Sequence, residues 1–332
     1  MGDTMEALAD RVRGWHRPMA WFAGVMAVMA VVSAVGLAVD DRILLGAPIW
    51  LKPLKFAISM AVYGLTWSWL YSLLATRRRL ASVVSSTTVV LLAVEYVVIV
   101  VQVVRGRPSH FNMSTPLDSA LWITMGGTIA ALWVGTAVLT GLVLRAPVAD
   151  PASRWAIRLG ALISLVGLAL GALMTSTPAQ TVPRTVGGVE RMIGAHSVGV
   201  PDDGPGMPLT GWSTTGGDLR IPHFVGMHAL QALPLLALLL TVLAVRLSWL
   251  RSSRLRAELI VIAAAAYAGM VAVLTWQAER GQSLVRPDPA TLVALAVLVV
   301  GALSAGGWVL RRRPGGGSPG AGGSAARTGV TA

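Results

Sequence analysis

The sequence predicts an all-α integral membrane protein with about eight transmembrane helices, on the basis of three observations. Hydrophobic residues make up 55% of the 332 residues, whereas charged residues make up 13%, about half of the usual share in soluble domains. Apolar runs of about 20 residues recur, and each is long enough to cross a hydrocarbon core of ~30 Å. Arginines concentrate in alternate segments between these runs. Together these features exclude an ordinary soluble domain.

The apolar runs define the expected helices in order. They are residues 19–39, 56–75, 81–104, 118–144, 155–174, 224–245, 258–277 and 290–310. The first run is longer than the apolar core of a signal peptide, about 7 to 15 residues, so we expect an uncleaved span. Thr115 with Pro116, and Asp288 with Pro289, have the pattern of helix starts.

The flanking segments complete the predicted organisation. We expect residues 1–18 to be a cytoplasmic N-terminal segment and residues 19–310 to form the membrane domain. Residues 311–332 are rich in Gly, Ser and Pro, which is typical of a disordered tail. Residues 175–223 form a long outer loop with turn sequences such as "DDGPG", and we expect it to pack on the membrane domain as a cap.

The arginines orient the predicted helices in the membrane. With the N-terminus in the cytoplasm, every inner segment is positively charged, as the positive-inside rule requires. Both termini are therefore predicted to lie on the cytoplasmic side of a bacterial cytoplasmic membrane. A net charge of +12 would indicate nucleic acid in a soluble protein, but here the bilayer accounts for the charge and no nucleic-acid partner is expected. The absence of cysteine excludes disulfides and thiolate chemistry.

Two pairs of similar strings raise the possibility of an internal duplication. "LKPLKF" (51–56) resembles "LRIPHF" (219–224), and "QVVRG" (102–106) resembles "QAERG" (277–281), in the same order. Two parallel four-helix repeats, residues 19–145 and 155–310, would explain both pairs. The alternative is chance, because basic residues, proline and phenylalanine all suit membrane interfaces.

Polar residues within the predicted spans are the first candidates for a site. Glu95 is a charged residue deep within a span, and such residues tend to mark function. It could instead be a structural carboxyl that bonds a neighbouring helix. His228 and Gln231 share a helix face and can form one polar layer with Glu95 and Gln102. His223 is turned about 140° from His228, which argues against a two-histidine metal grip.

Cations and histidines gather at the predicted outer rim. We expect His223 to face this rim. Its other candidate members are Lys52, Lys55, Trp50, Arg105, Arg107, His110, His196, Arg220, Glu279 and Arg280. Each cation alone could simply be a headgroup anchor. Four of the five histidines fall on the outer side, so the working face is predicted to be extracytoplasmic. These four are weak metal candidates, because no sequence spacing specifies a zinc or haem site: His110, His196, His223 and His228.

Three functional hypotheses remain open at this stage. The first is binding or transport of a small anionic or amphiphilic ligand, with Glu95 and His228 as a proton-responsive pair. The second is a membrane-embedded metal- or haem-dependent enzyme that uses the outer histidines. The third is a structural or accessory membrane subunit. No P-loop, GxSxG, HExxH or EF-hand motif occurs, and Gly167 with Gly171 has the spacing of close helix packing.

Three strings carry a resemblance to a known family. "VVQVVRGRPSHFNMSTPLD" (100–118), "GMPLTGWSTTGGDLRIPHFVGMHALQALPL" (206–235) and the entry "WLKPLKF" (50–56) are similar to strings of uncharacterised bacterial multi-pass membrane proteins. The shared patterns are "SHFN" and "GDLR..HF.G.HALQ". The resemblance implies that these strings form one site, and it implies no reaction, cofactor or ligand.

Overall fold

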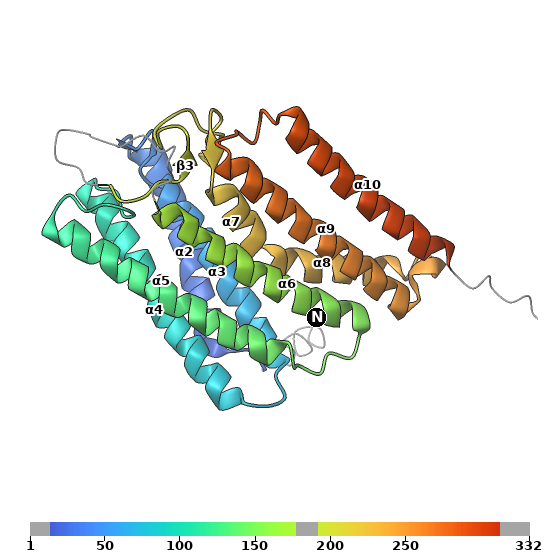
Figure 1. Cartoon of the computed structure of the whole chain (residues 1–332). Coiled ribbons are helices and arrows are strands. Elements are labelled where there is room, and N and C mark those ends of the chain that lie inside the picture. The colour runs from blue at the N-terminus through green and yellow to red at the C-terminus, as the bar shows by residue number, and fades with distance from the viewer. Residues whose placement is uncertain (1–13, 177–191, 313–332) are drawn as a thin grey trace, which may run out of the picture.

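The computed structural model describes residues 14–176 and 192–312, and it shows a bundle of long helices with short strands at one end (Figure 1). The helices are α2 (Arg17–Val39), α3 (Leu51–Ser72), α4 (Arg78–Arg105), α5 (Pro116–Val143), α6 (Pro151–Leu170), α7 (Arg220–Met227), α8 (Ala229–Leu243), α9 (Ser253–Glu279) and α10 (Pro289–Arg311), with short 3₁₀ helices η1 (Gly171–Thr175) and η2 (Ser248–Leu250). The predicted all-α class is confirmed. Most of the predicted N-terminal segment and tail, and part of the long loop, lie outside the described residues.

Most of the helices are long and apolar enough to cross a membrane. Six qualify within the described residues, and the pair α7 and α8, bent by 43° at its junction, makes a seventh if it is one span. The chain is therefore a multi-pass membrane protein whose environment is a lipid bilayer. The predicted count of about eight is met only in part. The span expected at 56–75 corresponds to α3, which is too polar to be counted with the others.

The polarity of α3 follows from its place in the bundle. One face of α3 is buried in protein, where Tyr63, Trp67 and Ser68 lie among core side chains. Tyr63 and Thr136 of α5 share a hydrogen bond of 2.8 Å, and the Ser68 hydroxyl donates to the carbonyl of His16 at 2.9 Å. A helix that packs on protein along much of its length can satisfy polar side chains that lipid could not.

The helices pack in two groups along the chain. α2 packs on α3, and α4 packs on α5, whereas α6 packs on α7, α8 and α9, and α10 lies on α9 (Figure 1). The contact between α6 and α7 is especially close, because a Cβ atom added at Gly167 would lie 2.3 Å from the carbonyl carbon of Gly226. The close packing predicted at Gly167 is confirmed.

One end of the bundle carries a cap, and we call it the cap end. It comprises residues 40–50, 106–115 and 192–219 together with the helix ends they cover. Strands β1 (Ile43–Leu44) and β2 (Ala47–Pro48) pair with each other, as do β3 (Ser197–Val198) and β4 (Gly217–Asp218). The described part of the long loop is tied down by hydrogen bonds from Ile193 N to Phe111 O, 3.0 Å, and from Ala195 N to Met174 O, 3.1 Å.

The predicted helix starts are found as expected. The Thr115 hydroxyl accepts from the Asp118 amide at 3.1 Å, and the Asp288 carboxylate accepts from the Thr291 amide at 2.8 Å. A proline follows each cap residue in the first turn, where its missing N–H costs nothing. These caps fix where α5 and α10 leave the cap end.

Candidate functional site

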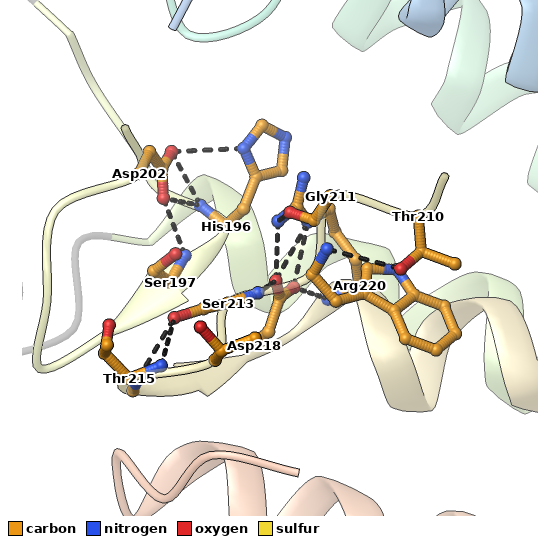
Figure 2. A network of polar contacts seen from close by, with 12 residues as sticks. His196, Ser197, Asp202, Thr210, Gly211, Ser213, Thr215, Asp218 and Arg220 are labelled. Atoms are coloured by element: carbon orange, nitrogen blue, oxygen red, sulfur yellow. Dashed lines mark hydrogen bonds and ion pairs between the residues drawn. The ribbon is translucent and has the colours of Figure 1, made fainter. Parts of the chain in front are cut away.

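Two helices begin beneath the cap with basic side chains. The Lys55 ammonium, near the start of α3, donates to the carbonyl of Thr210 at 2.7 Å. The Arg220 guanidinium, at the start of α7, donates to the carbonyl of Gly211 at 2.7 Å (Figure 2). Two neighbouring carbonyls of the cap thus accept hydrogen bonds from two cations that are far apart in the sequence.

Lys52 differs from its neighbours. Its ammonium makes no hydrogen bond or ion pair with any residue that the structure describes, and it lies 6.0 Å from the centre of the Phe56 ring. Lys55 and Arg220 are close enough to repel it electrostatically. A half-buried ammonium without an acceptor is unusual, because such a group normally keeps a partner. Lys52 is therefore the cation best able to take a ligand.

The acids of the cap are already engaged. Asp218 is fully buried and accepts from Arg220 Nη2 at 2.6 Å, from Arg220 Nε at 2.9 Å and from the Ser213 amide at 2.8 Å (Figure 2). Asp202 lies 3.1 Å from the Nδ1 atom of His196 and accepts from the Ser197 amide at 2.8 Å. Burial opposes ionisation of Asp202, but the hydrogen bond and charge of His196 and the backbone amides hold its pKa well below the usual range.

A cluster of rings lies beside these charges. His110 packs on Phe56, Phe111 and Trp122, with ring centres 5.7, 6.0 and 5.8 Å apart, and His196 packs on Phe111 at 5.1 Å. Burial lowers the pKa of His110 well below its usual value, and the nearby charges of Lys52 and His196 lower it further. Burial also lowers the pKa of His196, although its hydrogen bond to Asp202 opposes this. Both imidazoles lie close enough to Lys52 for its charge to act on them.

Glu95 lies deeper on the same side of the bundle. Its side chain is fully buried on α4, about ten residues from the end of the helix at Arg105 and hence ~15 Å along its axis. Oε1 accepts from the hydroxyl of Thr128 on α5. Oε2 is buried and has no hydrogen-bond partner among the described residues. Lys52 acts on this carboxyl electrostatically.

Gln102 and Arg105, both predicted site residues, instead tie α4 to α5. The Gln102 amide donates to Asp118 at 3.0 Å and to the carbonyl of Pro108 at 3.2 Å. Arg105 donates to Asp118 and to Gln102, both at 2.6 Å. Because these groups satisfy one another's hydrogen bonds, we assign them a structural role. We call this set of bonds between the end of one helix and the start of the next a latch.

His223 does not face the basic rim, and that expectation was wrong. Its Nδ1 atom donates to the carbonyl of Gly167 on α6 at 2.8 Å. The ring covers Gly171, where an added Cβ atom would come within 3.1 Å of it. The two glycines leave the space that the imidazole fills, so the ring points at α6 and away from the cations.

His228 lies at the bend between α7 and α8. Its Nδ1 atom donates to the side-chain oxygen of Gln231 at 3.3 Å, and Gln231 donates to the hydroxyl of Thr66 at 3.1 Å. No hydrogen bond joins His228 to Glu95 in the described part of the chain, so the predicted polar layer divides into two separate places. A small pocket beside the bend has room for about one water molecule. Its lining includes Ser59, Tyr63, Ser164, Met227, His228 and Gln231.

The bend itself has a clear structural cause. The carbonyls of Val225 and Met227, near the end of α7, accept from the hydroxyls of Tyr267 at 2.6 Å and Ser164 at 2.8 Å. Side chains of α9 and α6 thereby satisfy backbone groups at the interruption, which a membrane segment requires. Sequence reasoning missed this bend because Gly226, one residue before the end of α7, lies inside a continuous apolar run, and Pro234 lies farther along α8.

The histidines do not assemble into a metal site. Across residues 14–176 and 192–312, no three His, Asp or Glu side chains come together as a group able to hold a metal ion. His110 and His196 flank Phe111, whereas His223 and His228 lie at α6 and at the bend. The candidates that remain together at the cap end are Lys52, Lys55, Arg220 and His110, with Glu95 below them.

No protein-family model, curated protein or solved structure matches the chain. Sequence reasoning missed the most direct partners of the cations, the Thr210 and Gly211 carbonyls. Backbone acceptors leave no signal in residue identity, so no pattern in the sequence could have found them.

Proposed function

We propose that this chain is a polytopic protein of the bacterial cytoplasmic membrane that binds a small anionic or amphiphilic ligand at its cap end and transports it together with a proton. The observation that carries the proposal is Lys52, a half-buried cation without an acceptor among the described residues. The carboxylates nearest the cations, Asp218 and Asp202, are occupied by Arg220, His196 and backbone amides. A ligand with negative charge would supply the counter-charge that Lys52 lacks.

The proposed topology has α3 as an eighth span and the cap on the extracytoplasmic side. α3 has 22 residues, enough to cross the bilayer, and its polar side chains Tyr63, Thr66 and Ser68 have protein partners. Arginines at the end opposite the cap support a cytoplasmic location for that end. The described ones are Arg17, Arg77, Arg78, Arg79, Arg145, Arg154, Arg158, Arg246, Arg251, Arg254, Arg256, Arg311 and Arg312.

Similar latches support the proposed four-helix repeats. At the end of α4, Gln102 donates to a carbonyl six residues on, and at the end of α9, Gln277 does the same at 2.9 Å. A glycine with positive φ follows each helix, 66° at Gly106 directly after α4 and 70° at Gly281 two residues after the end of α9. The arginine before each glycine pairs with an aspartate at the start of the following helix, Arg105 with Asp118 and Arg280 with Asp288.

The proposed coupling uses Lys52 and Glu95. An anion bound at Lys52 is repelled by an ionised Glu95, because both lie in a poorly hydrated region where charges interact strongly. Protonation of the unpartnered Oε2 atom of Glu95 removes this repulsion and lets the anion bind more tightly. By reciprocity, the anion favours uptake of the proton. A carboxyl at this depth is costly to keep charged, which is typical of proton-coupled sites.

Binding to purified protein tests the proposal. Phosphate and a series of small carboxylates, such as acetate and benzoate, are titrated into wild type, Lys52→Met and Arg42→Gln. Arg42 is a matched control, because it is an exposed cation of the cap end that pairs with Asp40 outside the cluster. We expect at least one anion to bind wild type and Arg42→Gln equally and to bind Lys52→Met much more weakly. Equal binding to all three proteins, or to none, would contradict the proposal.

A further inference from the structure

We propose that residues 206–213, the cap hairpin, act as a plug that occupies the anion site with its own carbonyl oxygens and that an oxyanion ligand displaces it. This inference rests on the proposed function, because it assumes that the cations at the cap end receive an anion. It adds to that function the class of ligand, which carries a carboxylate or phosphate group. It also adds the way in which the cap hairpin controls access of this ligand to the anion site.

The cap hairpin is a defined local structure. Gly206 and Ser213 form an antiparallel bridge, and hydrogen bonds run from Met207 N to Trp212 O at 2.8 Å and from Gly211 N to Met207 O at 2.9 Å. Leu209 lies at the tip, with a positive φ of 64° and a side chain that is 81% exposed. The hairpin thus projects from the cap as a tight loop.

The base of the hairpin is anchored independently of its tip. Ser213 N donates to Asp218 at 2.8 Å, and the Ser213 hydroxyl accepts from Gly216 N at 3.1 Å. The amide and the hydroxyl of the next residue, Thr214, both donate to the carbonyl of Pro205 on the opposite strand at 3.0 Å. These bonds remain if the tip moves, so residues 206–212 can swing while the rest of the cap stays in place.

Within residues 14–176 and 192–312, few contacts other than those of the two cations hold the tip. No residue from Pro205 to Trp212 is buried, whereas residues 216–219 are buried without interruption. Segments with few buried contacts open at low free energy. The bonds from Lys55 to Thr210 O and from Arg220 to Gly211 O, both 2.7 Å, are therefore the main attachments of the tip.

The two carbonyls occupy the place of a ligand. They present two oxygens to two cations, as a carboxylate or phosphate does, but each carries only a partial charge. Lys52, Lys55 and Arg220 repel one another, and neutral carbonyls do not cancel that repulsion. An oxyanion supplies full negative charge with at least as many oxygens and therefore forms stronger hydrogen bonds than the carbonyls.

After the tip is displaced, three cations remain together and can bind an anion. Lys55 becomes available beside Lys52, and Arg220 stays oriented, because Asp218 holds its guanidinium through Nε and Nη2. Lys55 belongs to α3 and Arg220 to α7, so the closed hairpin also ties the two halves of the bundle together. Its release would therefore open the site and remove one of the ties between the halves, while the packing of α5 on α6 and the bond from Gln231 to Thr66 remain.

The absence of cysteine makes the test direct. Leu209→Cys and Ile43→Cys introduce the only two thiols, both at exposed positions, and spin labels report the distance between them. The labelled protein is measured alone, with sodium phosphate, with sodium acetate and with sodium chloride at equal ionic strength. Lys55→Met in this background removes one attachment of the tip, and Lys55→Arg keeps a donor at the same place.

We expect a narrow distance distribution in the unliganded protein and in Lys55→Arg. Phosphate or acetate should lengthen and broaden it, chloride should not, and Lys55→Met should show the broad distribution without any anion. A distribution that stays narrow while calorimetry shows phosphate or acetate binding would overturn the plug and leave the proposed function standing. A broad distribution in the unliganded wild type would also overturn the plug. If no anion binds to wild type or to Lys55→Met, the proposed function and the plug both fail.

Discussion

Lys52 and Lys55 lie three residues apart on α3, yet among the residues that the structure describes only Lys55 has an acceptor, the carbonyl of Thr210 at 2.7 Å. The Lys52 ammonium lies near the Phe56 ring. Lys55 and Arg220 repel it, and the buried Glu95 attracts it. Two cations that share a helix face therefore have different roles. Lys55 holds the cap, and Lys52 is left for a ligand.

Replacement of Lys52 should reduce binding while leaving the fold intact. Loss of a charge-assisted hydrogen bond costs about 1.5–3 kcal/mol, so Lys52→Met should weaken anion binding by roughly 10- to 150-fold. The melting temperature should be unchanged or slightly higher, because the electrostatic repulsion of Lys52 by Lys55 and Arg220 is removed. Calorimetric titration and a thermal melt on the same samples check both parts. A lowered melting temperature with unchanged affinity would assign Lys52 a structural role.

Replacement of Asp218 should loosen the cap. Asp218→Asn leaves Arg220 without its counter-charge in a largely buried place, which costs about 3 kcal/mol. Hydrogen exchange of the β3 and β4 amides should accelerate accordingly. Asp40→Asn is the control, because it weakens an exposed pair with Arg42 elsewhere on the cap end. Equal protection of β3 and β4 in both variants would show that the Asp218 pair does not hold the cap.

The close contact between α6 and α7 can be tested with single methyl groups. A Cβ at Gly167 would lie 2.3 Å from Gly226, so Gly167→Ala should destabilise the protein by about 1–3 kcal/mol. Gly126→Ala on α5 is the matched control, since no atom lies within 4 Å of the added Cβ. It should be neutral or mildly stabilising, because alanine favours a helix. Chemical denaturation in detergent measures both, and a Gly167→Ala protein as stable as the control would refute the contact.

Acid should destabilise the cap through its buried imidazoles. Burial holds the pKa of His110 and of His196 below the unfolded value of about 6.5. The unfolded chain then binds more protons, so stability is full above that value and falls as the pH drops below it. His110→Phe preserves the ring contacts with Phe56 and Trp122 but removes one titrating group.

Thermal unfolding between pH 7.5 and 5.5 measures this effect. The melting temperature of wild type should decline toward pH 5.5, and that of His110→Phe should decline less, with His196 accounting for the remainder. Asp202 adds a loss only at lower pH, because its stabilisation begins to fall below the unfolded carboxyl pKa of about 4 and is lost as the pH approaches its depressed pKa in the folded protein. Identical slopes for the two proteins would show that His110 does not contribute.

The sequence predicted the helices better than the contacts between them. Apolar runs identified the membrane helices, because lipid requires them, and the loss of this signal in α3 reflects its protein-facing polar residues. The gathering of Lys52, Lys55 and Arg220 at one end followed from their positions at helix starts. The orientation of His223 could not be predicted, because it depends on the space above Gly171 and on the Gly167 carbonyl. The bend at His228 depends likewise on hydroxyls of other helices.

The pH dependence of anion affinity tests the central claim most directly. An anion identified as a ligand is titrated at several pH values into wild type and Glu95→Gln, with proton uptake measured in parallel. If one proton is taken up with each anion, the wild-type affinity for the anion should fall by about tenfold for each pH unit above the pH at which Glu95 ionises. Glu95→Gln should bind at every pH as wild type does at low pH and should take up no proton. Wild-type affinity independent of pH, or the same dependence in Glu95→Gln, would contradict the account.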